Sequence, residues 1–199
     1  MPDSWVQVAN SALTKLGDSL IVSFDDDSPR AALVKERYQP ARDHVLRMHP
    51  WNCAMKRVSS ANLSSPAPAF DYTYYHSLPD DWLRTIFIGP DGTDYRIEGR
   101  YIATDATELE HRYIRRVSDP TEIDTLCGEA IAFYLAWDIC TRLQQNGEIK
   151  QEMWNGFQAM LRTAKTVDAQ EEPTKELRAN EWLDSRWGDA GFSRAHNSG

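Results

Sequence analysis

The stretch SFDDDSPRAALVKERYQP, residues 23–40, contains the clearest start of a helix in the chain. Ser28 followed by Pro29 is typical of a helix N-terminus, because serine caps the first free amides and proline fits the first helical position. Asp25–Asp27 lie just ahead of this start, where the helix dipole favours negative charge by about 0.3–1 kcal/mol. We therefore predict a helix over residues 29–48.

The same three aspartates allow a second interpretation, a calcium loop of EF-hand type. Such a loop needs ligands at alternate positions, a glycine in its middle and a closing glutamate. Counted from Asp25, Pro29 falls on a ligand position and Arg30 falls on the glycine position. We favour the entrance to a helix over a metal site.

Further helices are predicted on both sides of this stretch. Apolar residues recur at three- and four-residue spacing from about Ser4 to Leu16, which indicates an amphipathic helix. A capped start at Asp119-Pro120 precedes a long apolar helix, and another helix follows from about Glu148 to Ala169. We expect these last two to form a long antiparallel helical hairpin.

Pro40 lies within the helix predicted over residues 29–48. Proline lacks the amide hydrogen that a helix interior uses, and its ring crowds the preceding turn. We therefore expect a kink or a break near Lys35 to Tyr38.

The segment between Trp51 and Val117 has a different character. Aromatic and β-branched residues gather there in short runs separated by turn signals, for example YTYYHSL (72–78) and WLRTIFI (82–88). This pattern predicts an antiparallel sheet of about four strands. The last run alternates, with Glu108, Glu110, Arg112 and Arg116 on one face and Leu109, Tyr113 and Val117 on the other.

The charged face of that last strand has two interpretations, which the sequence leaves open. It is either a solvated face with ion pairs between strands or a charged seam against a neighbouring subunit. Under the second interpretation, Arg112 and Arg116 are interface residues.

These elements together predict an α+β fold. A helical bundle domain (1–58 and 119–170) combines the N-terminal helices with the long C-terminal helical hairpin. An antiparallel β-rich lobe (59–118) is inserted in it, and a C-terminal extension (171–199) follows.

Composition excludes several classes of protein. The chain has 199 residues, of which 41% are hydrophobic and 26% charged, typical of a globular domain. No apolar run approaches the roughly 20 residues of a membrane helix, and MPDSWVQVAN lacks the features of a signal peptide. Three cysteines without a C-x-x-C pair indicate a reducing compartment. We expect the product to stay in the cytoplasm where it is made.

The net charge of −8, from 30 acidic and 22 basic residues, disfavours a DNA-binding module. Sequence-independent DNA binding neutralises phosphates with Lys and Arg. An acidic chain instead suits a surface that DNA passes without sticking.

The sequence gives little support for any catalytic or metal-binding residue. His44 and His49 lack a third ligand in useful spacing, so interaction with the end of a helix is favoured over a zinc site. Cys53 lacks support for a nucleophilic role beyond the nearby His49, so burial is favoured. A glycosidase needs only two placed carboxylates, which the sequence cannot exclude. We predict no catalytic residue, cofactor or metal.

The C-terminal segment beyond Pro173 carries large aromatic residues outside the predicted core. A buried tryptophan at an interface contributes about 2 kcal/mol or more, so this segment is interpreted as an arm that binds a partner. The alternative is that it folds back on the helical hairpin. The predicted contact residues are Leu177, Trp182, Leu183, Trp187 and Phe192.

Three motifs resemble the head-to-tail adaptors of short-tailed phages, the tail tubular protein A group. They are ALTKLG (12–17), SFDDDSPRA (23–31) and RDHVLRMHPWNCA (42–54). The order of elements that follows, ending in EWLDSRW (181–187), is also similar, and the resemblance covers roughly residues 8–170. The family usually has an aromatic residue after Trp-Asn, where this chain has Cys53.

The resemblance implies a structural protein of the virion neck, not an enzyme. Its copies would form a dodecameric ring between the portal protein and the tail nozzle protein. The helical face and the C-terminal extension would meet the portal, the β-rich lobe would face the tail, and the genome would pass the lumen without specific binding. The alternative function is a tail-associated cell-wall glycosidase that uses paired carboxylates.

Overall fold

The computed structural model describes residue 2 and residues 4–171. The predicted contact residues of the C-terminal segment lie outside this part of the chain. The described elements, in chain order, are α1 (Trp5–Lys15), α2 (Pro29–Met48), the short 3₁₀ helix η1 (Asn52–Ala54), β1 (Met55–Ala61), β2 (Tyr74–Ser77), β3 (Trp82–Gly89), β4 (Tyr95–Glu98), β5 (Tyr101–Thr104), β6 (Glu108–Arg115), the 3₁₀ helix η2 (Pro120–Glu122), α3 (Thr125–Leu143) and α4 (Gly147–Glu171).

The predicted starts of α1 and α2 are confirmed. The Ser4 hydroxyl accepts a hydrogen bond from the amide of Gln7 at 3.2 Å, and the Ser28 hydroxyl accepts one from the amide of Ala31 at 3.1 Å. Each serine therefore satisfies one of the free donors in the first turn of its helix.

The predicted break in α2 is wrong, because the helix is continuous through Pro40. Pro40 and Glu36, whose carbonyl loses its usual donor, both lie on the exposed face of α2. Water can satisfy that carbonyl, and the buried face holds the helix together through Val34, Tyr38 and Ala41.

The predicted start of α3 is displaced. Asp119 caps only the short helix η2, where its carboxylate accepts from the amide of Thr121 at 2.9 Å. A second cap follows at once, because the Asp124 carboxylate accepts from the amide of Cys127 at 2.9 Å. The chain therefore turns at Ile123, which is fully buried, before α3 begins.

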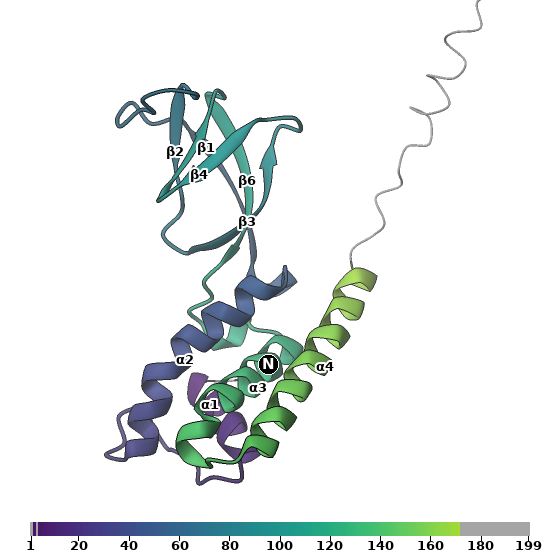
Figure 1. Cartoon of the computed structure of the whole chain (residues 1–199). Helices are drawn as coiled ribbons and strands as arrows, with labels where there is room; N and C mark the ends of the chain where they lie inside the picture. Colours follow the sequence, from purple (N-terminus) through teal and green to yellow (C-terminus); the bar gives the residue numbers. More distant parts are fainter. Residues whose placement is uncertain (1, 3, 172–199) are drawn as a thin grey trace, which may run out of the picture.

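The predicted helical architecture is also wrong: among the described residues there is no long helical hairpin bundle. Four α-helices and two small antiparallel sheets form an α+β fold, so the prediction fits only loosely at the level of fold class. The helices α1, α2 and α4 each pack on α3, as Figure 1 shows. The reason is the composition of α3, which buries residues on several faces and so accepts a neighbour on each.

The β-rich region contains two three-stranded sheets instead of the predicted single sheet. Their strand orders are β1-β6-β3 and β2-β5-β4, and every pair is antiparallel. We call these two sheets together the β-lobe. A small apolar core joins them, formed by Leu78, Ile88, Ile102 and Leu109.

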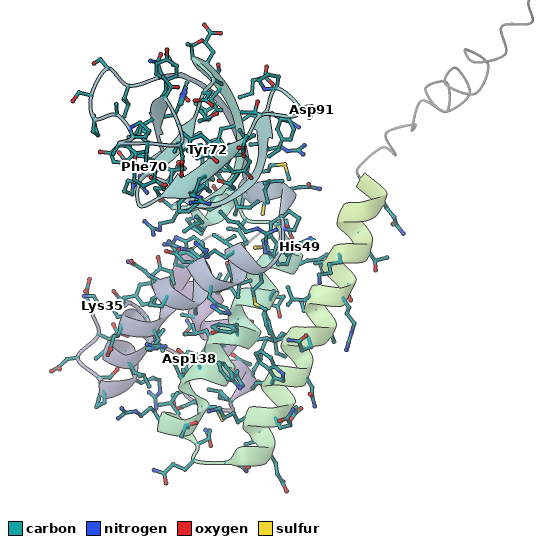
Figure 2. The ribbon with its side chains drawn as sticks, turned by 45° about the horizontal axis from the view of Figure 1, so that its top comes forward. Lys35, His49, Phe70, Tyr72, Asp91 and Asp138 are labelled. Carbon is teal, nitrogen blue, oxygen red and sulfur yellow. The ribbon has the colours of Figure 1, made fainter. Side chains whose placement is uncertain are left out.

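A larger core fills the helical part and continues into the sheet β1-β6-β3. It includes Trp51 after α2, Leu83 on β3 and Ile114 on β6. We call this region, where the helices meet the sheet, the neck. Figure 2 shows His49 there, with Phe70 and Tyr72 on the β-lobe and Asp138 among the helices.

Hydrogen bonds reinforce the neck in both directions. The Arg47 guanidinium donates to the carbonyl of Leu83, and the Arg84 guanidinium donates to the carbonyl of Arg47 at 2.7 Å. The Trp5 indole donates to the carbonyl of Ser118 at 2.8 Å. These side chains of α1, α2 and β3 therefore bond the helices to β3 and to the segment that follows β6.

Across residues 4–171, the helices fall short of the length and apolar character required to cross a lipid bilayer.

Gly156 offers a test of the contact between α3 and α4. Alanine is a better helix former than glycine by about 1 kcal/mol, but a Cβ at Gly156 would overlap the ring of Phe133 on α3. We expect Gly156→Ala to lower the free energy of unfolding by about 1–3 kcal/mol, the usual cost of overpacking.

The matched control is Gly147→Ala in the same helix, because a Cβ there meets no atom within 4 Å. This control should leave the stability unchanged or slightly raised. Urea denaturation of both variants measures the difference. A Gly156→Ala protein as stable as the control would contradict the packing of α3 on α4.

Candidate functional site

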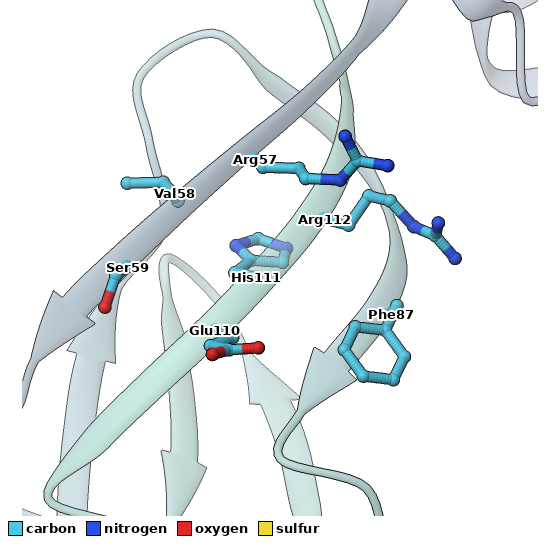
Figure 3. A pocket seen from close by; sticks show the side chains of 7 residues that line it. All are labelled: Arg57, Val58, Ser59, Phe87, Glu110, His111 and Arg112. Carbon is cyan, nitrogen blue, oxygen red and sulfur yellow. The ribbon is translucent and has the colours of Figure 1, made fainter.

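The main candidate site is a hollow of about 450 Å³ on the sheet β1-β6-β3. Strand β1 contributes Arg57, Val58 and Ser59, strand β6 contributes Glu110, His111 and Arg112, and strand β3 contributes Phe87. Figure 3 shows these side chains, with the guanidinium groups of Arg57 and Arg112 extending in the same direction.

Two arginines lie directly opposite each other in this hollow. Arg57 on β1 pairs in register with Arg112 on β6, and Arg112 pairs on its other side with Phe87 on β3. Like charges directly opposite in an antiparallel sheet destabilise it, whereas opposite charges contribute about 0.2–1 kcal/mol. The strand pairing therefore holds two positive charges together at a cost.

Protein groups compensate this cost only in part. The guanidinium carbon of Arg112 lies 5.6 Å from the centre of the Phe87 ring, within the range of a cation–π contact. Among the described residues, neither Arg57 nor Arg112 forms an ion pair, although most of the other arginines and lysines do.

The Nε atom of Arg112 is buried and has no hydrogen-bond partner within the described part of the protein. A buried donor without an acceptor costs about 1–3 kcal/mol, and more when the group is charged. Arg112 therefore carries an unused donor at the edge of the hollow.

The charge of the hollow follows from its titratable groups. Arg57 and Arg112 are positive and Glu110 is negative, while burial lowers the pKa of His111 to about 4 and keeps it neutral near pH 7. The sum of these charges is a single positive charge. Such a site can bind an anion by hydrogen bonds from guanidinium groups.

The hollow lacks the groups for glycoside hydrolysis. Both mechanisms need two carboxyl groups on either side of the bond that breaks. Glu110 is the one carboxylate among the residues that line this hollow.

A second hollow, of about 410 Å³, lies between α1 and α3. Its one carboxylate, Glu129, accepts from the ammonium of Lys15 at 2.8 Å and from the hydroxyl of Ser11 at 3.1 Å. Both oxygens of this carboxylate are therefore already used within the fold.

The structure separates Arg112 and Arg116, which one of the two sequence-based interpretations places together in a charged seam. Arg112 lines the hollow, whereas Arg116 lies beyond the end of β6 and donates from Nε to Asp43 on α2 at 2.8 Å. Asp43 also pairs with the buried Arg42 at 2.9 Å. Arg116 thus joins the β-lobe to the helices within one chain.

The aspartates before α2 act in the turn that leads into the helix. The Asp26 carboxylate accepts from the amides of Val22 and Ser23 at 2.7 and 3.2 Å, and Asp25 pairs with Lys35 at 2.7 Å. In residues 4–171, no group of three or more His, Cys, Asp or Glu side chains is placed to hold a metal ion.

The histidines and cysteines considered from sequence have different surroundings. The ring of His44 stacks on Tyr134 at 4.6 Å between centroids, whereas His49 contacts Trp51 edge-on at 5.0 Å. Cys53 is half-buried, and all three cysteines are free thiols. Burial raises the pKa of the Cys140 thiol, which makes it a poor nucleophile.

Arg57 and Phe87 were missed as site residues from sequence. Residues 55–61 have no strong alternation of apolar and polar side chains, so β1 was not predicted as a strand. Arg57 meets Arg112 only because β1 pairs with β6, from which it is separated by some fifty residues. The local sequence around Arg57 does not indicate that pairing.

Comparison of the chain with models of known protein families and with curated proteins gives no match.

His111 provides a test of the β-lobe core through pH. Its ring is 3% exposed, packs against Tyr113 and has Nε2 at 3.0 Å from the Thr85 hydroxyl. Burial lowers its pKa to about 4 in the folded protein, against about 6.5 when unfolded. The unfolded chain therefore binds an extra proton between these values, and the protein should lose about 3 kcal/mol of stability as pH falls from 6.5 to 4.

The measurement is urea denaturation of the wild type and of His111→Gln across this pH range. The glutamine can keep a hydrogen bond to Thr85 but does not titrate, so the difference between the two proteins isolates the histidine. Equal slopes of stability against pH would show that His111 is accessible to protons in the folded state.

Proposed function

We propose that this protein is a structural head-to-tail adaptor of a phage virion, assembled in the host cytoplasm. In this proposal, copies of the chain form a dodecameric ring between the portal protein and the tail nozzle protein, and the genome passes through the lumen. The basis is the resemblance of three sequence motifs to the tail tubular protein A group, together with the arrangement of the chain.

The observation that carries the proposal is the position of those motifs in the fold. SFDDDSPRA forms the turn and the cap that begin α2, and RDHVLRMHPWNCA forms the end of α2 and the neck. Of the three motifs, RDHVLRMHPWNCA is therefore the one that joins the β-lobe to the helices, whereas ALTKLG lies at the end of α1 and SFDDDSPRA at the start of α2. A capped helix start is a common feature, whereas a helix that is followed by Pro50 and anchored by the buried Trp51 is a more specific one.

The shape of the chain also suits an adaptor. Helices and β-lobe lie at opposite ends of the described part (Figure 1) and are joined by a continuous apolar core at the neck. An adaptor must present two different surfaces, one to each neighbour, at a fixed distance. The net charge of −8 suits a lumen wall, since like charge repels passing DNA.

No specific observation favours the alternative, a glycosidase. Each of the two described hollows offers one carboxylate, Glu110 or Glu129.

The proposal assigns portal binding to the segment that begins at Pro173. Deletion of residues 173–199 should leave a folded protein that no longer adds a layer to portal rings from the same genome. Electron microscopy of the mixture measures the layer, and circular dichroism measures the fold. Normal binding by the truncated protein would show that this segment is not the portal contact.

A finer test replaces Trp182 and Trp187 by alanine in the full chain. Each loss should weaken portal binding by about thirtyfold, if each tryptophan contributes about 2 kcal/mol. The matched control is Phe70→Ala, because Phe70 is an aromatic residue of the β-lobe that is 78% exposed. If the wild-type protein itself adds no layer to the portal, the adaptor proposal is wrong.

A further inference from the structure

The arginine pair on β1 and β6 outnumbers the acids of its hollow, in which Glu110 is the one carboxylate. Arg57 and Arg112 face each other in register, and within residues 4–171 neither forms an ion pair. A sheet that only had to be stable would place opposite charges at such positions. The pair can therefore take up an acid from outside the described part of the chain.

The donors of the hollow suit a planar anion. Guanidinium groups bind carboxylates through two parallel hydrogen bonds, which gives direction as well as strength. The buried Nε of Arg112 lacks an acceptor among the described residues, and a carboxylate that binds side-on accepts from Nε and Nη together. The Phe87 ring lies beside the same guanidinium, with its centre 5.6 Å from the guanidinium carbon.

The charge of the hollow distinguishes a carboxylate from phosphate. Arg57 and Arg112 together with Glu110 leave one positive charge, which one carboxylate neutralises. A nucleic acid would bring a row of phosphates against Glu110 and against a chain of net charge −8, which costs binding energy.

We propose that this hollow binds one carboxylate, an Asp or Glu side chain of a second copy of this chain, between the guanidinium groups of Arg57 and Arg112. The second copy as the occupant rests on the proposed ring, whereas the binding of a carboxylate does not.

Charge complementarity favours a second copy. Side by side in a ring, acidic copies repel one another unless positive groups of one meet negative groups of the next. A ring also repeats one contact between two different surfaces of the chain. The hollow supplies the positive surface, and exposed acids such as Asp71 and Asp91 on loops of the β-lobe are available for the negative one.

The first experiment tests the site without the ring. The full chain, labelled with ¹⁵N in its arginines, is titrated with a capped Gly-Glu-Gly peptide, and the Nε–H signal of Arg112 is followed by NMR. We expect a saturable shift that the Gly-Gln-Gly peptide does not cause. Arg57→Gln should weaken the binding about tenfold, as expected for the loss of one charge-assisted hydrogen bond.

The matched control is Arg96→Gln, since Arg96 is an exposed arginine on β4, in the other sheet. It should bind the glutamate peptide as the wild type does. No shift with the peptide, or tighter binding of inorganic phosphate or of a short DNA duplex, would overturn the carboxylate site.

The second experiment tests the occupant. Arg57→Gln/Arg112→Gln protein is mixed with portal rings, and electron microscopy counts the portals that carry a complete layer. We expect single copies on the portal but about tenfold fewer complete layers than with Arg96→Gln, since each copy loses one contact to its neighbour. Thermal melting of both variants checks that they are folded.

The outcomes separate this inference from the proposed function. Complete layers with the double variant would overturn the second copy as the occupant and leave the adaptor function intact. No layer with the wild type would overturn the adaptor function and, with it, the second copy, while the peptide titration would still decide the carboxylate site.

Discussion

The burial of Trp51 is the constraint on which the rest of the structure depends. Its side chain is fully buried, and its indole donates to the carbonyl of Val45 at 3.0 Å. That carbonyl belongs to the last turn of α2, where helices leave acceptors unsatisfied. One side chain therefore ends the long helix, fills the core of the neck and sets the direction in which the chain enters β1. The hydrogen bonds of Arg47 and Arg84 then fix β3 to the same turn.

The helix α3 has a comparable role among the helices. Its buried residues, among them Ala130, Ile131 and Leu135, lie on more than one face, so it cannot be stable at the surface. The helices α1, α2 and α4 cover those faces. Charged contacts at the margins complete the arrangement, as in the pair of Arg37 with Asp138 at 2.6 Å. The result is a small helical layer around a central helix, which carries the β-lobe between α2 and α3.

Features with a local sequence signal are predictable in this chain, whereas features that depend on pairing between distant segments are not. The Ser28-Pro29 start needs only neighbouring residues, and so it was predictable. Asp119 and Asp124 are both suitable caps and lie within six positions of each other. Asp119 caps only a short 3₁₀ helix, the chain turns at the buried Ile123, and α3 begins after Asp124. The sequence pattern predicts one sheet instead of two, because alternation within a run does not reveal which other run it pairs with. The hollow was not predictable for the same reason. Arg112 is a candidate residue from sequence, but its pairing with Arg57 and Phe87 depends on the strand order β1-β6-β3.

The insertion of the β-lobe between two helices has a mechanical consequence. The chain enters the lobe through β1 and leaves it through β6, and these two strands pair with each other next to the neck, where Met55 lies opposite Ile114. A force that pulls the lobe away from the helices is therefore shared by two adjacent strands that are tethered at the same end. Neither strand is peeled from the other, and the tension passes directly to the packed side chains around Trp51. The β-lobe can thus transmit a pulling or twisting force to the helices as a rigid unit, before its own sheets unfold.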